Sequence, residues 1–123
     1  MAVLATGYIS KTLKKLVLAE CDRITDSGLS ILKHICCLEE LNLAECGPKI
    51  TDSGGMTVPL VASLKKLSLT WFINLLDVTV FAIAKNCVNL MAIDLTGCEL
   101  VTGVGVRAFG NHECLEYFVG FLL

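Results

Sequence analysis

The sequence predicts an α/β solenoid in which short parallel strands line a concave face and helices cover the convex face. Leucine recurs at nearly constant steps, two apolar residues in each copy alternate as in a strand, and helix-starting signals follow them. The leading leucines of the copies are Leu13, Leu38, Leu64, Leu90 and Leu115, which gives steps of 25, 26, 26 and 25 residues. A period of this length over nearly the whole chain indicates a stacked-repeat protein.

Each copy opens with a pattern that predicts a short strand. The copies read LKKLVL from Leu13, LEELNL from Leu38, LKKLSL from Leu64 and LMAIDL from Leu90, and a partial copy begins at Leu115. Side chains alternate between the two faces of a strand. The last two apolar residues of each pattern therefore point together into a core, and the residues between them point outward.

Helix-starting signals follow the strands. Residues 24–28 and 50–54 both read Ile-Thr-Asp-Ser-Gly, and Thr or Asp before an apolar-periodic run is typical of a helix N-cap. The helical apolar positions are Leu29, Leu32 and Ile35, then Val80, Ile83 and Ala84 after Asp77, and Val106 and Phe109 after Thr102. Gly54, Gly55 and Pro59 predict that the second helix is short or irregular.

The repeat divides the chain without any domain boundary. We expect one unit over 1–123, with about four and a half repeats of 25–26 residues at 13–37, 38–63, 64–89, 90–114 and a partial one at 115–123. Residues 1–12 match the helix of a preceding repeat. Neither end has the polar cap that a solenoid needs, so we expect a fragment, an aberrant gene product or a segment followed by more repeats. Self-association is expected through these uncapped ends, above all Phe118 to Leu123.

The composition restricts the partners. The chain is 54% hydrophobic and 18% charged, whereas soluble domains average about 45–50% apolar and about 25% charged. Such a small, apolar chain either lies on a membrane or stacks against more protein. No apolar run approaches the ~20 residues of a membrane-spanning helix. The net charge of −2, with scattered Lys and Arg, also argues against nucleic acid. We therefore expect no membrane and no nucleic-acid partner.

The seven cysteines are predicted to be reduced thiols in the cytoplasm or nucleus, because their number is odd and no export signal precedes them. Cys21, Cys46 and Cys98 each follow a strand. They are expected to be structural thiols that pack as small hydrophobes and satisfy backbone groups of the neighbouring turn. Phe72 holds this position in the third copy and would act by packing alone.

Two other groups of residues are candidates for a metal or redox site. His34 lies beside Cys36 and Cys37, and His112 lies near Cys114. The paired C-x-x-C spacing of structural zinc does not occur. We therefore expect no metal and no cofactor.

The pattern L-x-x-L-x-L-x-x-C, with its two Ile-Thr-Asp-Ser-Gly blocks, resembles the cysteine-containing leucine-rich repeat of F-box/leucine-rich-repeat proteins. The resemblance covers Leu13 to Leu123, with departures at Phe72 and Gly103. It implies a horseshoe-shaped solenoid that forms the substrate-binding segment of an F-box-type receptor in a cullin–RING ubiquitin ligase. The ligase adaptor would bind only if an F-box lies elsewhere in the gene. The alternatives are a free-standing repeat scaffold or inhibitor unrelated to ubiquitin, and a receptor fragment that senses a small ligand.

The candidate protein-binding residues occupy the outward positions of the repeats on the concave face. They are Lys15, Val17, Glu20, Glu40, Asn42, Glu45, Lys66, Ser68, Trp71, Asp94 and Tyr117. The lysine and glutamate columns are expected to neutralise one another. Trp71 is the only tryptophan and is the main contact candidate, because tryptophan is enriched in interface hot spots. Its alternative role is packing beside Phe72.

Catalysis is not expected. No Ser or Cys nucleophile is paired with a base at the level of a motif, and no glycine motif has the spacing of a phosphate-binding loop. The sequence therefore predicts a non-catalytic protein-recognition module.

Overall fold

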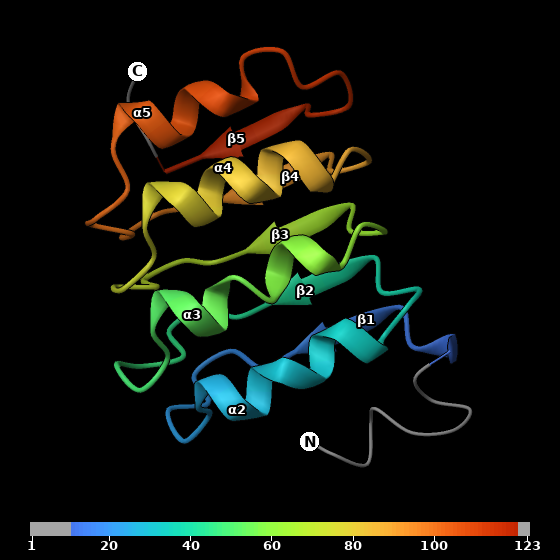
Figure 1. Ribbon diagram of the computed structural model, residues 1–123, viewed down its shortest axis with the longest axis vertical. Coiled ribbons are helices and arrows are strands. Elements are labelled where there is room, and N and C mark those ends of the chain that lie inside the picture. Colours follow the sequence, from blue (N-terminus) through green and yellow to red (C-terminus); the bar gives the residue numbers. More distant parts are fainter. Residues whose placement is uncertain (1–10, 121–123) are drawn as a thin grey trace.

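Residues 11–120 are described by the computed structural model, and they form a parallel sheet with a layer of helices against it (Figure 1). The strands pair in chain order and are β1 (Lys15–Val17), β2 (Glu40–Asn42), β3 (Lys66–Ser68), β4 (Ala92–Asp94) and β5 (Tyr117–Val119). Every strand pairs with the same position of the next copy, which places Leu16, Leu41, Leu67, Ile93 and Phe118 in one row. The predicted parallel strands are confirmed.

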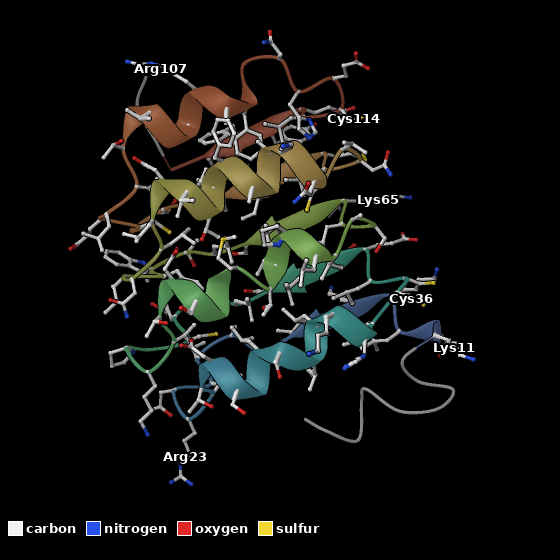
Figure 2. The ribbon with its side chains drawn as sticks, in the orientation of Figure 1. Lys11, Arg23, Cys36, Lys65, Arg107 and Cys114 are labelled. Atoms are coloured by element: carbon white, nitrogen blue, oxygen red, sulfur yellow. The ribbon has the colours of Figure 1, made fainter. Side chains whose placement is uncertain are left out.

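The helices lie on the other side of the core (Figure 1). They are α2 (Asp26–Leu29) with the 3-10 helix η2 (Ser30–His34), α3 (Asp52–Gly55) with η3 (Val58–Leu60), α4 (Asp77–Asn86), and α5 (Gly103–Val106) with η4 (Arg107–Phe109). The loops that follow the strands form what we call the strand-exit edge, and the loops that precede the strands form the strand-entry edge. In Figure 2, Cys36, Lys65 and Cys114 lie along the strand-entry edge, and Arg23 lies on the opposite side.

The spacing of the apolar residues accounts for the type of each helix. Leu29, Leu32 and Ile35 are separated by three residues, which matches the three residues per turn of a 3-10 helix. The helix expected to extend through Ile35 is therefore mostly 3-10 and ends at His34, although Ile35 is buried. The apolar residues at 80, 83, 84 and 87 instead follow the α-helical pattern, and α4 is an unbroken helix of 10 residues.

The second helix is short, as the sequence predicts. The segment α3 has four residues, and Pro59 lies in the separate 3-10 turn that follows it. Proline lacks the backbone N–H that would continue an α-helix. Gly54 and Gly55 are both buried, so at these positions the chain comes close to its neighbours.

The core is a single aliphatic column between the sheet and the helices. The leading leucines Leu38, Leu64 and Leu90 are fully buried, whereas Leu13 and Leu115 at the two ends of the described stack are only partly buried. A repeat therefore completes its burial only when it has a neighbour on each side. The remnant helix predicted at 1–12 falls almost entirely on residues 1–10, which lie outside the described residues, as do residues 121–123 of the predicted partial repeat.

A carboxylate in the first turn of one helix holds the start of the next helix. Asp26 accepts hydrogen bonds from the backbone N–H of Thr51 at 2.8 Å and from its hydroxyl at 2.6 Å. Asp77 accepts the same two bonds from Thr102, with 2.7 Å to its backbone nitrogen. Each threonine is also the N-cap residue of its own helix. The predicted capping residues therefore connect neighbouring repeats as well as starting helices.

The third repeat makes the same connection with a different residue. Leu76 is its N-cap residue and has no hydroxyl, so Asp52 accepts from the backbone N–H of Leu76 at 2.9 Å and from the hydroxyl of Thr79 at 2.7 Å. Gly54 and Gly105 hold the position that corresponds to Thr79 in their repeats. A Cβ atom there would overlap the carboxylates of the preceding repeats. In each of these three pairs of repeats, one hydroxyl donates a hydrogen bond to the aspartate.

Gly54→Ala and Gly105→Ala are expected to lower the free energy of unfolding by about 1–3 kcal/mol each, because the new methyl group displaces a carboxylate from charge-assisted hydrogen bonds. The displaced carboxylates are those of Asp26 and Asp77. Urea unfolding followed by far-ultraviolet circular dichroism measures the loss.

Gly28→Ala is the matched control for these two substitutions. Gly28 holds the same position of the first repeat, but a Cβ there meets only Ile24 Cγ2, at 3.8 Å. This variant is expected to be unchanged or up to about 1 kcal/mol more stable, since alanine favours a helix over glycine. Equal losses in all three variants would contradict the role given to the carboxylates.

Candidate functional site on the concave face

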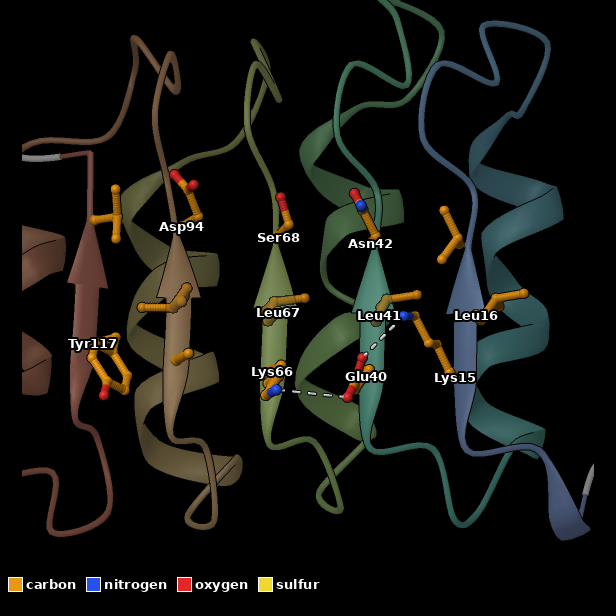
Figure 3. A pocket seen from close by; sticks show the side chains of 14 residues that line it. Lys15, Leu16, Glu40, Leu41, Asn42, Lys66, Leu67, Ser68, Asp94 and Tyr117 are labelled. Carbon is orange, nitrogen blue, oxygen red and sulfur yellow. Dashed lines mark ion pairs between the residues drawn. The ribbon is translucent and has the colours of Figure 1, made fainter.

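The outward side chains of the five strands line an open depression of about 300 Å³. Figure 3 shows them in two rows, with Lys15, Glu40, Lys66 and Tyr117 toward the starts of the strands and Asn42, Ser68 and Asp94 at their ends. The strand leucines between these rows point to the core and leave only parts of their surface in the depression. A surface formed by several adjacent repeats suits an extended partner better than an enclosed small molecule.

Lysine and glutamate side chains pair across the starts of the first three strands. Glu40 lies 3.6 Å from Lys15 Nζ and 3.9 Å from Lys66 Nζ. Glu39 bridges Lys14 and Lys65 in the same way, at 3.6 Å each. All of these side chains are substantially exposed, so each pair stabilises the fold by less than about 1 kcal/mol. The expected neutralising ladder is present, and each glutamate shared by two lysines leaves one positive charge in excess.

The side chains at the strand ends are held by their own backbone. Asn42 Oδ1 accepts from the N–H of Ala44 at 2.9 Å, and Asp94 Oδ1 accepts from the N–H of Thr96 at 2.9 Å and from its hydroxyl at 2.7 Å. Such local bonds fix a short polar side chain relative to the chain turn that follows it. This end of the depression therefore presents polar groups in fixed positions.

The third residue after each of the first four strands lies in the left-handed backbone region. Glu20, Glu45 and Trp71 have φ of 61°, 55° and 59°, and Gly97 has φ of 79°. Three non-glycine residues in this region show that the stacked turns impose the conformation, since it costs an L-residue about 1–2 kcal/mol. The turn carries these side chains past the strand ends, to the strand-exit edge.

The indole of Trp71 lies against the next repeat. A Cβ atom at Gly97 would overlap the six-membered ring of the indole, so the ring rests directly on the Gly97 backbone. Trp71 is 48% exposed, whereas its neighbour Phe72 is 4% exposed. The alternative of packing beside Phe72 is therefore replaced by packing on Gly97, with the remaining surface of the indole open to solvent.

The structure brings most of the predicted binding residues together. Eight of the eleven line the depression: Lys15, Val17, Glu40, Asn42, Lys66, Ser68, Asp94 and Tyr117. Glu20, Glu45 and Trp71 lie beyond the strand ends at the strand-exit edge. Sequence reasoning missed Ala92 and Val119, which also line the depression. Their outward position in the repeat was the available signal. Protein binding by these residues stays a prediction.

Three buried thiols bond to neighbouring repeats, two of them directly after strands and Cys87 at the end of α4. Cys46 donates to the carbonyl of Leu18 at 3.2 Å, and Cys98 donates to that of Leu69 at 3.0 Å. Cys87 donates to the carbonyl of Val61 at 3.5 Å. Burial raises the pKa of all three thiols to about 11, because a thiolate is poorly solvated there.

The metal candidates remain dispersed. Cys36 and Cys37 have their sulfurs 3.6 Å apart, and this hydrogen bond is the main cause that raises the pKa of Cys37. His112 accepts at Nδ1 from the N–H of Leu115, so its Nε2 carries the proton and donates to the Cys87 carbonyl at 2.9 Å. Within residues 11–120, no three His, Cys, Asp or Glu side chains are grouped to hold a metal ion. Over the same residues, no helix is long and apolar enough to cross a membrane.

Comparison with known proteins identifies the type of repeat. The family model described as Leucine Rich repeat matches residues 10–32, 34–58 and 86–110. A chain in the crystal structure of the Rad7 and Elc1 complex from yeast has a similar fold, with a TM-score of 0.53 and 20% identity over 80% of this chain. This chain spans 31% of the length of that chain. None of the curated proteins matches. The predicted α/β repeat fold is confirmed, and the F-box part of the resemblance stays a prediction.

Native thiol titration is expected to separate the seven cysteines. Cys36 and Cys114 are exposed and should react first near pH 8, Cys21 and Cys37 more slowly, and the three buried thiols only on unfolding.

The stability of the fold is also expected to depend on pH through the three buried thiols. Their pKa of about 11 in the fold lies above the ordinary 9.0, so their contribution to the free energy of unfolding is complete below pH 9 and falls as the pH rises from 9 to 11. Urea unfolding at several pH values measures this. Cys98→Ala should reduce the fall, and a buried thiol that reacts in the native state would contradict the assignment.

Gly97→Ala is expected to lift the indole of Trp71 from the backbone beneath it. Because Trp71 is the only tryptophan, its fluorescence reports this displacement directly. The emission should change, and acrylamide should quench it more efficiently. The free energy of unfolding should fall by about 1 kcal/mol, because alanine is strained in the left-handed backbone region. Gly103→Ala is the control, since a Cβ there meets only Arg107 Nη2 at 4.0 Å. Unaltered quenching in Gly97→Ala would contradict the stacking.

Proposed function

Because this chain belongs to the leucine-rich repeat family, we propose that it is a non-catalytic module whose concave face recognises another protein. The observation that carries the proposal is the depression across all five strands, in which paired charges flank partly exposed apolar side chains. Such a mixed, multi-repeat surface is typical of protein recognition by solenoids. Among its polar side chains, Glu40 pairs with Lys15 and Lys66, and Asn42 and Asp94 accept hydrogen bonds from nearby backbone groups.

The finer proposal is the substrate-binding segment of an F-box-type receptor in a cullin–RING ubiquitin ligase. Its support is the recurrence of cysteine after the strands, at the position where Cys46 and Cys98 bond to the preceding repeat. The similar chain from yeast comes from a complex of two proteins, which is compatible with a role in an assembly. An F-box elsewhere in the gene would recruit the ligase adaptor.

A cytoplasmic or nuclear location belongs to the same proposal. The thiols of Cys46, Cys87 and Cys98 donate hydrogen bonds to backbone carbonyls, and each would lose that bond on oxidation to a disulfide. Reducing compartments preserve thiols.

Site-specific photo-crosslinking in cells tests the binding face. A photoreactive phenylalanine analogue replaces Asn42 or Tyr117 on the concave face, and replaces the exposed Lys33 or Lys85 in the helix layer as the matched controls. The same protein is expected to be crosslinked from both concave positions and not from the helix layer. Ser68→Arg, which places a bulky cation in the centre of the depression, should reduce these adducts about tenfold or more.

The identity of the co-purifying proteins separates the candidate roles. A cullin and its adaptor in the purified complex of the full gene product support the receptor role. Concave-face adducts without them identify a free-standing scaffold or inhibitor. Adducts formed mainly from the helix layer, or adducts unaffected by Ser68→Arg, would sink the proposal that the concave face is the recognition surface.

A further inference from the structure

The strand-exit edge of the third and fourth repeats exposes large apolar side chains beyond the concave face. They are Trp71, Ile73, Leu76 and Val78 after β3, and Leu100 and Val104 after β4, and their exposed fractions range from 40% to 66%. We call these six residues the edge patch. Only Trp71 belongs to the binding residues predicted from the sequence.

The first two repeats provide an internal comparison for the edge patch. Their residues at three matching positions are polar. Glu20 and Glu45 correspond to Trp71, and Thr25 and Thr51 correspond to Leu76. Ser27 and Ser53 correspond to Val78. All four repeats share the strand, the turn and the helix start. The fold is therefore built equally well with polar residues at these positions. The apolar residues of the third and fourth repeats require another reason.

Two contacts connect the loops that carry the two halves of the edge patch. The indole of Trp71 rests on Gly97 in the loop after β4. Asp77, which follows Leu76, accepts hydrogen bonds from Thr102 in the same loop. The two loops are therefore fastened to each other at both ends, and the indole is held in place before any partner binds. A pre-positioned aromatic ring loses little conformational freedom on binding.

The surroundings of the edge patch are acidic. In the described part of the chain, eight carboxylates lie at this edge or at the adjoining strand ends, and they outnumber the three cations Arg23, Lys49 and Arg107. Asp26, Asp52 and Asp77 bond to the next repeat, and the other five are Glu20, Asp22, Glu45, Asp94 and Glu99. Within residues 11–120 the ion pairs are made by Glu39 and Glu40, whose lysine partners include Lys65 at the opposite edge (Figure 2). An acidic border beside an apolar patch complements a basic and apolar partner.

We infer that the edge patch and its acidic border bind a segment of a partner protein that combines a large apolar side chain with a neighbouring lysine or arginine. The apolar side chain covers the exposed part of the indole and Leu76. The basic side chain lies over the indole or pairs with the carboxylate of Glu45 or Asp94. An aromatic ring and a carboxylate each attract a cation at such a site. This inference rests on the proposed protein-binding role and extends the contact from the concave face around the strand-exit edge.

Selection from a phage-displayed library of random twelve-residue peptides on the intact chain tests the inference. The expected peptides carry an aromatic or large aliphatic residue close to Lys or Arg, and their binding changes the emission of Trp71. Leu76→Thr with Val78→Ser should weaken a selected peptide about tenfold or more. These substitutions introduce the residue types that the first two repeats carry, so the fold is expected to tolerate them. Glu45→Gln with Asp94→Asn should weaken it and reduce its salt dependence.

Two controls separate this inference from the proposed function. Ser27→Val adds an apolar side chain at the matching position of the first repeat and should leave peptide affinity unchanged. Ser68→Arg blocks the centre of the concave face and leaves the six apolar residues of the edge patch in place. Because Ser68 lies beside Asp94 on the neighbouring strand, the edge variants used for this comparison are Leu76→Thr with Val78→Ser, which lie outside the concave face. Peptides sensitive to Ser68→Arg but not to the edge variants would overturn the inference and leave the concave-face proposal standing. Peptides sensitive to the edge variants alone support the inference.

Other outcomes overturn the inference directly. Selected peptides that are acidic, peptides insensitive to both sets of variants, or no enrichment over a heat-denatured chain would each contradict it. A second copy of the chain is the other occupant of such a surface. If light scattering finds a dimer that Leu76→Thr converts to a monomer, the edge patch is a dimer interface and the inference fails.

Discussion

The structure depends on burial that is shared between neighbouring repeats. A strand of three residues and one short helical segment cannot enclose a core, so each row of leucines is covered by the rows above and below it. The polar connections follow the same rule, because the aspartate of one helix satisfies the start of the next and the thiol after one strand satisfies a carbonyl of the preceding repeat. The high apolar content of the chain is therefore the requirement of a core that extends in one dimension.

The sequence predicts the parts of the fold that depend on the period and fails where the answer depends on a neighbour in space. Constant leucine steps predict the strands and their order, and Thr51 and Thr102 are recognisable as helix caps. The sequence does not explain why one repeat has Thr79 where two others have Gly54 and Gly105. The reason lies in the carboxylate of the preceding repeat that faces each position. The spacing of Leu29, Leu32 and Ile35 predicts a helix, and the structure shows that most of this helix is 3-10.

The sequence predicts the candidate site from matching outward positions in successive repeats, and it does not predict how exposed each side chain is. Outward strand positions are assigned correctly by alternation, which brings Lys15, Asn42 and Tyr117 to one depression. The alternation ends at the turn, where the left-handed backbone of Trp71 redirects the chain. Residues after that turn, such as Leu76, have no strand parity to identify their face. The distribution of charge between the two edges is visible only when the repeats are stacked. At the strand-entry edge, pairing with glutamate offsets much of the lysine charge. At the strand-exit edge, carboxylates predominate.

The unbroken helix α4 also has a consequence for the curvature of the molecule. Adjacent strands are about 4.8 Å apart, whereas an α-helix with its side chains is about 10 Å wide, so wide helices on one side of a sheet force the stack to bend. A 3-10 helix is wound more tightly, and the other helical segments contain 3-10 turns that α4 lacks. The bend is therefore expected to be sharpest beside β3 and β4. A partner that fits this part of the arc would distinguish the third and fourth repeats from the first two by shape as well as by chemistry.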